Sequence, residues 1–224
     1  MYFPASLLDD RGTSSTASDK IGQCVLYIVR HANVAEDSKG LIRGLLNPPL
    51  DAKGKRGAED VVEFFKDKPI SAIYADDLKR TKQTALPLAA DKGLEVQIDP
   101  DLRSWDVGTE LEGKPIDEHE DEIAELRQQP DKIPVGGQSW GEYQDQVDRW
   151  LWKFVHMGMD AYSPLVAISH GSAIQVIFQQ LGEDVEIGDY SAIPLEPAGV
   201  AGLFLTRFGL RVRILEGAGD NEDA

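Results

Sequence analysis

The sequence predicts an α/β protein of three layers, with helices on both faces of a mostly parallel central sheet. Two apolar runs, residues 25–29 and 165–169, are typical of buried strands. Between them, apolar residues at helical spacing alternate with short strand-like runs, as in parallel α/β folds. Two further apolar runs, residues 200–206 and 210–215, are joined by three residues and predict a closing antiparallel hairpin.

A helix, a strand and a second helix are expected after the first strand. Apolar residues at positions i, i+3, i+4 and i+7 predict a helix over about residues 52–66. The short run 70–75 is strand-like. The next helix, over residues 77–90, contains Pro87 and therefore has to kink or end early.

Two more helices flank the strand at residues 165–169. Ser139 and Glu142 match a capping box, and an apolar and aromatic stripe follows at helical spacing. This stripe consists of Tyr143, Val147, Trp150, Leu151 and Phe154. After the strand, a second stripe from Ile174 to Leu181 predicts a helix that Gly182 ends.

Length and composition favour one main domain in a soluble, cytoplasmic protein. The chain has 224 residues, of which 42% are hydrophobic, and no apolar stretch reaches the roughly 20 residues that span a bilayer. We expect a mobile leader over residues 1–20, a domain over 21–215 and an acidic tail over 216–224. The net charge of −16 argues against nucleic acid and anionic membranes as partners and favours a small molecule.

An acidic stretch interrupts the alternation of strands and helices. Residues 99–125 contain eleven acidic and two basic side chains, a pattern typical of a solvated face. We interpret the region of about 99–137 as an insertion or cap, which would contact the substrate and disfavour highly charged ones.

Ionisable residues directly follow both of the buried strands. Arg30 and His31 end the first strand, and His170 ends the other, so both histidines are expected at the carboxyl edge of the sheet. Arg80 falls in the first turn of a predicted helix, where a guanidinium beside free N–H groups suits phosphate oxygens. A neutral imidazole is a competent nucleophile toward phosphorus, and nearby arginines disfavour its protonated form. The sequence therefore predicts an active site that binds phosphate.

Five segments in a fixed order carry a family resemblance. They are residues 26–32 (LYIVRHA), 43–54 (RG and NPPLDAKG), 73–85 (IYADDLKRTKQTA), 135–140 (VGGQSW) and 167–171 (AISHG). Together they resemble branch 1 of the histidine phosphatase superfamily, the phosphoglycerate-mutase-like enzymes. The resemblance runs from about residue 25 to residue 177.

The resemblance implies a phosphoglycerate-mutase-like fold and a phosphatase that needs no metal or other cofactor. His31 would attack the phosphoryl group of a small phosphomonoester, and water would then hydrolyse the phosphohistidine. The resemblance further implies that a set of polar side chains holds the phosphoryl oxygens and the substrate. These residues are Arg30, Arg80, His170, Arg43 and Asn33.

The sequence departs most from the family pattern at the position of the proton donor. The family usually has a glutamate in a Leu-Arg-Glu-like segment, whereas residues 102–108 (LRSWDVG) have Ser104 at that position. A serine hydroxyl is far too weak an acid for this role. Asp106 lies on the same side of an extended segment and is our expected donor, with Glu110 and Glu112 as second choices.

Other functions stay open at this point. A protein that lacks the proton donor could keep its phosphate pocket only to bind a phosphorylated ligand. A phosphomutase would need a stable phosphohistidine in a site closed to water. Residues 137–141 (GQSWG) also fit the Gly-x-Ser-x-Gly motif of serine esterases, with Asp148 or Asp160 and His170 following. Prolines and glycines precede this motif where an esterase needs a buried strand, so Ser139 is better explained as a helix cap.

The oligomeric state is also open. Trp140, Trp150 and Trp152 give one helix more aromatic surface than a single core face requires, which leaves a homodimer as an expectation.

Overall fold

The computed structural model describes residues 22–35, 40–181, 195–207 and 209–215, and it has the predicted α/β fold. The strands are β1 Gln23–Arg30, β2 Ala72–Ala75, β3 Val96–Ile98, β4 Leu165–Ser169, β5 Val200–Thr206 and β6 Gly209–Leu215. The helices are α2 Ala52–Phe65, α3 Lys79–Lys92, the 3-10 turn η3 Pro100–Leu102, α4 Glu120–Gln128, α5 Trp140–Asp160 and α6 Gly171–Leu181. The predicted leader and acidic tail, and Gly182, lie outside the described residues.

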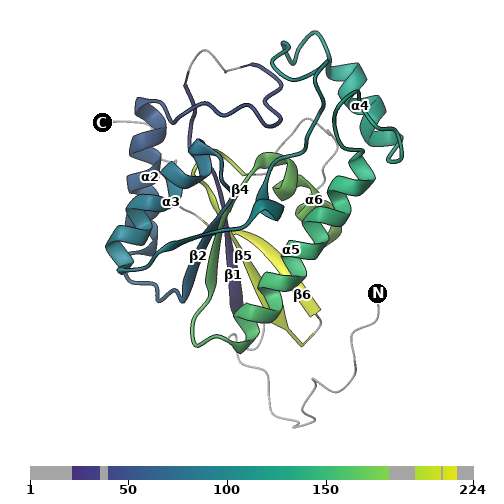
Figure 1. The fold of residues 1–224 in the computed structure, drawn as a ribbon. Coiled ribbons are helices and arrows are strands. Elements are labelled where there is room, and N and C mark those ends of the chain that lie inside the picture. Colours follow the sequence, from purple (N-terminus) through teal and green to yellow (C-terminus); the bar gives the residue numbers. More distant parts are fainter. Residues whose placement is uncertain (1–21, 36–39, 182–194, 208, 216–224) are drawn as a thin grey trace.

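The six strands form one sheet in the order β3-β2-β4-β1-β5-β6 (Figure 1). β3, β2, β4 and β1 are parallel, whereas β5 and β6 form the predicted antiparallel hairpin. Arg30 of β1 pairs with Ser169 of β4, and Ala75 of β2 pairs with Ile168. Three neighbouring strands therefore end at nearly the same level of the sheet.

Helices cover both faces of the sheet, which confirms the three layers. α2 and α3 lie on one side of the sheet, and α5 and α6 on the other (Figure 1). β4 shows why both faces are apolar, since all five of its residues are buried. Leu165 and Ala167 belong to the core under α5 and α6, whereas Val166 and Ile168 belong to the core under α2 and α3.

The predicted helices form with small differences. Ser139 caps α5, and its capping box with Glu142 is complete. α3 continues through Pro87 to Lys92 and ends at Gly93 in the left-handed conformation. β3 and α4 are additional elements that the sequence patterns did not indicate.

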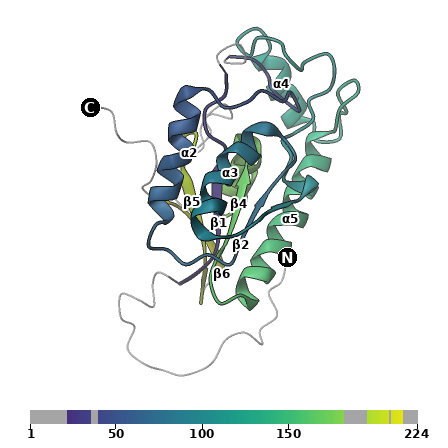
Figure 2. The same cartoon turned by 60° about the vertical axis from the view of Figure 1, so that its left-hand side comes forward.

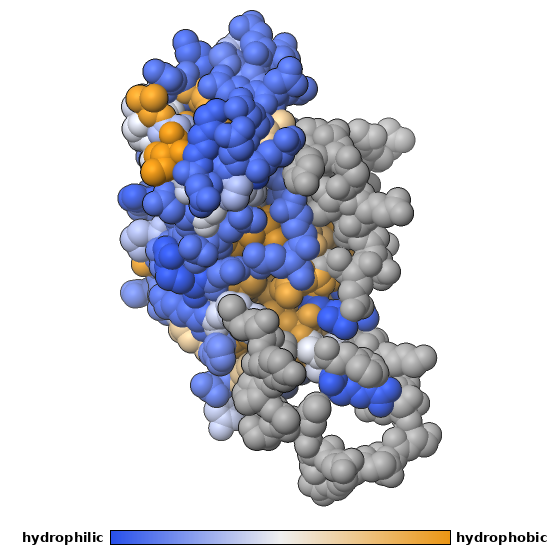
Figure 3. Space-filling view, turned by 90° about the vertical axis from the view of Figure 1, so that its right-hand side faces the viewer, coloured by the Kyte–Doolittle hydropathy of each residue, from blue (hydrophilic) through white to orange (hydrophobic). Residues whose placement is uncertain are grey.

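The acidic region predicted as a cap lies beyond the carboxyl ends of the strands, with α4 at its tip (Figure 2). It is joined to the segment after β1 by backbone hydrogen bonds, from Ile42 to Lys114 and from Gly113 to Ile42, both 2.8 Å. Its exposed apolar side chains include Ile116, Ile133 and Val135. The surface there is otherwise mainly hydrophilic (Figure 3).

Within the described residues, no helix combines the length and the apolar composition that crossing a bilayer requires.

Gly54 provides a direct link between a helix and the segment that follows β1. A Cβ atom at this position would lie 1.9 Å from the carbonyl oxygen of Asn33. We expect Gly54→Ala to lower the free energy of unfolding by about 1–3 kcal/mol, because the overlap with backbone outweighs the better helix propensity of alanine. Urea unfolding followed by circular dichroism measures this. Lys55→Ala, at an exposed position of the same helix, is the matched control, and equal stability of the two variants would contradict the expectation.

Candidate active site

The two histidines singled out in the sequence lie together at the carboxyl edge of the sheet. The backbone N–H of His31 donates to the carbonyl of Ser169 at 2.9 Å, which continues the pairing of β1 with β4. The ring centroids of His31 and His170 are 5.2 Å apart. Both side chains are buried, with 5% and 2% of their surface exposed. Adjacent parallel strands therefore bring together two residues that are far apart in sequence.

His31 is held as a neutral ring with a free Nε2 lone pair. Its Nδ1 lies 2.8 Å from the carbonyl oxygen of Ala32. A carbonyl oxygen only accepts hydrogen bonds, so Nδ1 carries the proton and the lone pair is on Nε2. Burial holds the pKa of His31 well below its ordinary value, and the positive charge of Arg80 lowers it further. Nε2 is thus available as a nucleophile at neutral pH.

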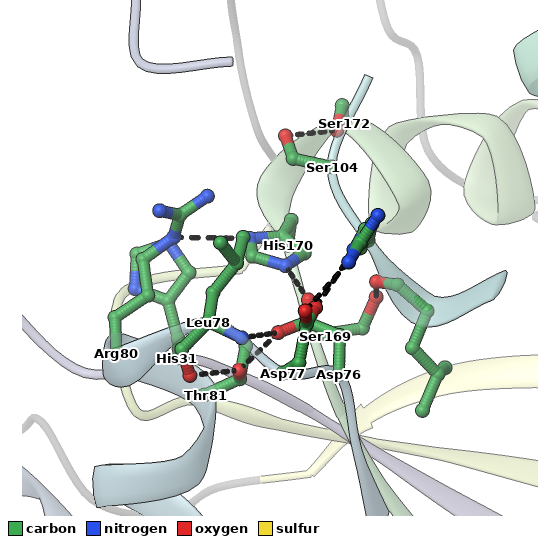
Figure 4. Close-up of polar contacts among 12 residues, drawn as sticks. His31, Asp76, Asp77, Leu78, Arg80, Thr81, Ser104, Ser169, His170 and Ser172 are labelled. Atoms are coloured by element: carbon green, nitrogen blue, oxygen red, sulfur yellow. Dashed lines mark hydrogen bonds and ion pairs between the residues drawn. The ribbon is translucent and has the colours of Figure 1, made fainter. Parts of the chain in front are cut away.

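His170 has the opposite tautomer, because its two nitrogens face different partners (Figure 4). Its Nε2 donates to the Oδ2 atom of Asp76, and its Nδ1 accepts a hydrogen bond from the Nε of Arg80 at 3.3 Å. Burial lowers the pKa of His170 to about 4, and the positive charge of Arg80 acts in the same direction. Asp76 acts in the opposite direction. The ring is therefore neutral at pH 7, with its proton on Nε2.

Asp76 is a fully buried carboxylate at the end of β2. Its Oδ1 accepts hydrogen bonds from the N–H of Leu78 at 2.7 Å and from the hydroxyl of Thr81. Burial raises the pKa of Asp76, but the hydrogen bonds from His170, Thr81 and Leu78 outweigh it and bring the pKa below its ordinary value. Asp76 is therefore ionised, and all its interactions orient it toward His170.

Arg80 connects the histidines with the segment that precedes α2. Its Nη1 and Nη2 donate to the carbonyls of Leu46 and Gly44, the latter at 3.1 Å, and only 1% of the residue is exposed. Burial lowers the pKa of Arg80 to about 10, and the charge of Arg43 acts in the same direction. The guanidinium is still charged at pH 7, so it places positive charge beside His31 and His170.

Arg30 brings a further positive charge and an unused donor. Its Nη1 donates to the carbonyl of Leu195 at 2.7 Å. Its Nε is buried and has no hydrogen-bond partner among the described residues. Burial lowers the pKa of Arg30 to about 10, with Arg43 contributing. A buried donor without a partner in a cluster of positive charges is typical of a site that binds an anion.

The candidate proton donors lie in different surroundings. The Oδ1 atom of Asp106 accepts from the N–H of Gly108 at 3.1 Å, within its own turn. Glu112 accepts from the N–H of Leu45 at 2.6 Å, and its charge raises the pKa of Arg80, so this carboxylate lies nearer the arginine. Ser104 is 3.3 Å from the hydroxyl of Ser172, which in turn contacts Tyr143. Asp106 stays a prediction.

The remaining predicted residues take the following places. Arg43 is half-buried and acts on both histidines through its charge, and Asn33 accepts a backbone hydrogen bond from Asp51. Ser139 accepts from the N–H of Glu142, and residues 129–138 before it contain no strand, so the esterase interpretation loses its structural basis. Trp140 and Trp150 are buried in the core and provide no docking surface. The homodimer stays an expectation.

Asp76 is the residue of the site to which the sequence patterns assign no role, although it lies in the family-like segment 73–85. Like the two histidines, it is an ionisable residue directly after a buried strand, and this is the signal that marks it.

Comparison with protein families gives a match over most of the chain. The profile of the histidine phosphatase superfamily (branch 1) matches residues 26–215. A protein of Salmonella paratyphi A named "Probable phosphoglycerate mutase GpmB" is 33% identical over 154 residues, which cover 66% of this chain and 70% of that protein.

Solved structures with the same fold include phosphatases. The α-ribazole phosphatase of Shigella flexneri superposes with a TM-score of 0.68 and 20% identity, over 89% of this chain and 99% of its own. A mycobacterial glucosyl-3-phosphoglycerate phosphatase gives the same TM-score and identity, over 87% of this chain and 98% of its own.

The two histidine tautomers can be tested without a substrate. In the phosphate-free protein at pH 7, we expect His31 to carry its proton on Nδ1 and His170 on Nε2, since a carbonyl and a carboxylate accept these protons. As the pH falls, His170 should stay neutral past the ordinary value of about 6.5 and gain a proton only near its pKa of about 4. Long-range ¹H–¹⁵N correlation spectra report both properties. Identical tautomers, or a charged His170 at pH 7, would contradict this arrangement.

Proposed function

Because the chain belongs to the histidine phosphatase superfamily (branch 1), we propose that it is a metal-independent phosphatase acting through a phosphohistidine on His31. The substrate would be a small phosphomonoester. The observation that carries the proposal is the state of His31, a buried neutral ring whose Nδ1–H is fixed on a carbonyl. This leaves the Nε2 lone pair free to attack phosphorus.

The surrounding charges support phosphoryl transfer. Arg43 and Arg80 act on both histidines through their charge, and Arg43 also acts on Arg30, so three guanidinium groups gather at the site in a chain whose overall charge is −16. A bound phosphoryl group would offset their mutual repulsion, and charge spread over its oxygens would be stabilised as the P–O bond breaks. Positioning and electrostatics are the main protein contributions to this reaction class.

Substrate choice is assigned to the acidic cap. Residues 111–116 of this region pair with the segment 40–46, whose carbonyls hold Arg80. A negatively charged rim disfavours substrates with several phosphates or carboxylates. A phosphomonoester of modest charge fits this surface best.

Phosphoglycerate mutase activity is the second candidate, and the name of the Salmonella relative at 33% identity favours it. Both reactions begin with the same transfer to histidine. They differ in whether water or an alcohol accepts the phosphoryl group from the histidine.

The role of His31 can be tested by phosphate release from p-nitrophenyl phosphate in the presence of EDTA. We expect His31→Ala to abolish turnover, because His170, the other neutral imidazole of the site, faces Asp76 and Arg80 with its two nitrogens. His156→Ala, an exposed histidine on α5, is the matched control and should keep full activity. Acid-labile ³²P on the wild-type chain, absent from His31→Ala, would identify the phosphohistidine. Wild-type protein that binds phosphate but turns over no phosphomonoester would make phospholigand binding the function.

A second measurement separates the phosphatase from the mutase. We expect incubation with 3-phosphoglycerate to release inorganic phosphate, or to leave the substrate unchanged, without forming 2-phosphoglycerate. ³¹P spectra distinguish these three species in one sample. Conversion to 2-phosphoglycerate that exceeds phosphate release would overturn the phosphatase assignment and leave the phosphohistidine in place.

A further inference from the structure

The contacts of His170 have a consequence for any phosphate that binds beside it. Its Nε2–H is engaged by Asp76, and its Nδ1 faces Arg80 as a bare acceptor. A phosphate oxygen is also an acceptor, so the ring as it stands has no proton to offer it. His170 can hold a phosphoryl oxygen only after Nδ1 has gained a proton and given up the hydrogen bond that it accepts from the Nε of Arg80.

A bound phosphomonoester favours protonation of Nδ1 and, in its monoanionic form, can provide the proton. A monoanionic ester carries it on the phosphoryl group, whose second pKa is near 6, and a dianionic ester draws it from water. The resulting imidazolium lies between two anions, the ester and Asp76. Asp76 and the bound ester together stabilise the charged form of His170. Without the ester, the ring is neutral.

We propose that His170, held by Asp76, is the proton donor to the leaving oxygen, the role for which this chain lacks a glutamate at position 104. The inference rests on the proposed phosphatase function. His170 is the catalytic residue in this step, and Asp76 is its positioning residue. The geometry supports it, since the ring is buried 5.2 Å from the ring of His31, centroid to centroid.

In this scheme, His170 gives a proton in the first half-reaction and takes one back in the second. The Nε2 lone pair of His31 forms the bond to phosphorus while the bond to the ester oxygen breaks. The electron pair stays on that oxygen, which takes the proton from Nδ1 of His170. Water then attacks the phosphohistidine, neutral His170 takes one proton of that water, and the N–P bond breaks to release phosphate.

The charged groups around His170 agree with this cycle. Asp76 faces it from the end of β2, Arg80 from α3, His31 from the end of β1 and Arg43 from the segment before α2. The two arginines oppose protonation in the empty site. A bound dianion offsets them, so the proton is taken up when the substrate arrives and is available for transfer.

Other carboxylates fit the role less well. Asp106 uses one oxygen on its own turn, and Glu112 uses one oxygen on the N–H of Leu45. Neither of these two hydrogen bonds involves either histidine. Asp76 itself is fully buried behind His170 and is fully hydrogen-bonded, so it acts through the ring.

The test is how the rate depends on the leaving group. p-Nitrophenolate leaves without a proton, whereas an alkoxide needs one. We expect Asp76→Asn to lower kcat for an alkyl phosphate by about 10²- to 10⁴-fold, the usual range for general acid catalysis, and kcat for p-nitrophenyl phosphate by less than about tenfold. The amide donates toward Nε2, which reverses the tautomer of His170, so the neutral ring can bind phosphate but has no spare proton.

Two further variants keep the test decisive. His170→Gln retains a donor for a phosphoryl oxygen but no transferable proton, and it should show the same selective loss. Asp77→Asn removes a neighbouring carboxylate that pairs with Arg103 at the surface, at 2.5 Å, and should leave the ratio of the two rates unchanged. Circular dichroism and inorganic phosphate binding check that each variant folds.

The outcomes separate this inference from the proposed function. Equal losses on both substrates for Asp76→Asn and His170→Gln, in folded variants, would reduce Asp76 to a structural role and overturn the inference. A selective loss in Glu112→Gln or Asp106→Asn instead would transfer the role to that carboxylate. No turnover by the wild type would overturn the proposed function itself, whatever the variants do.

The pH profile gives an independent readout. A donor imidazolium makes kcat fall on the basic side, as His170 loses its proton in the complex. Removal of the negative charge in Asp76→Asn lowers the pKa of the bound imidazolium, so this basic limb should move to lower pH. An unmoved limb in an active Asp76→Asn protein would contradict proton donation by His170.

Discussion

The buried carboxylate of Asp76 is the interaction on which the geometry of the site depends. An isolated carboxylate in a protein interior costs several kcal/mol, and here three donors from His170, Leu78 and Thr81 compensate it. Two of these donors belong to the start of α3, so the carboxylate fixes that helix start and the ring of His170 at once. Arg80, in the same helix turn, then lies beside the other nitrogen of the ring. One ionised side chain thereby sets the helix, the tautomer and the position of the guanidinium.

The site and the surface of the protein have opposite charge. The net charge is −16, and much of it comes from the region over the carboxyl ends of the strands. Below this region, Arg43 and Arg80 act on two neutral histidines through their charge, and Arg43 also acts on Arg30. The long-range field therefore repels anions while the buried groups attract them. Under the proposed function, this charge distribution would favour substrates with one phosphate and little other negative charge, because the acidic surface would repel them only weakly and the buried arginines would attract them strongly.

Sequence patterns predicted the helices and strands in which apolar residues follow one clear pattern. β1 and β4 are nearly continuous apolar runs, and α5 has a clear apolar stripe with a capping box, so their identity was unambiguous. β3 has only three residues, of which two are exposed, and its place depends on pairing with β2. α4 is formed largely by acidic and polar residues and buries only Leu126, so its sequence resembles a solvated loop. In the site, His31, His170 and Asp76 all directly follow a buried strand. The contact of Asp76 with His170, between the ends of the adjacent strands β2 and β4, is not revealed by sequence spacing.

The strand order also has a consequence for how the chain assembles. β4 lies between β1 and β2 although it follows both in sequence, and the second neighbour of β1 is β5, which comes later still. In a nascent chain, β1 therefore has no native partner strand until β4, which begins at residue 165, has been synthesised. At ordinary rates of translation this interval is on the order of 10 s. For that time both edges of an apolar strand are open to pairing with other chains. The yield of folded protein in a cell is thus set in part by how well the nascent chain is kept apart from its neighbours before β4 is inserted.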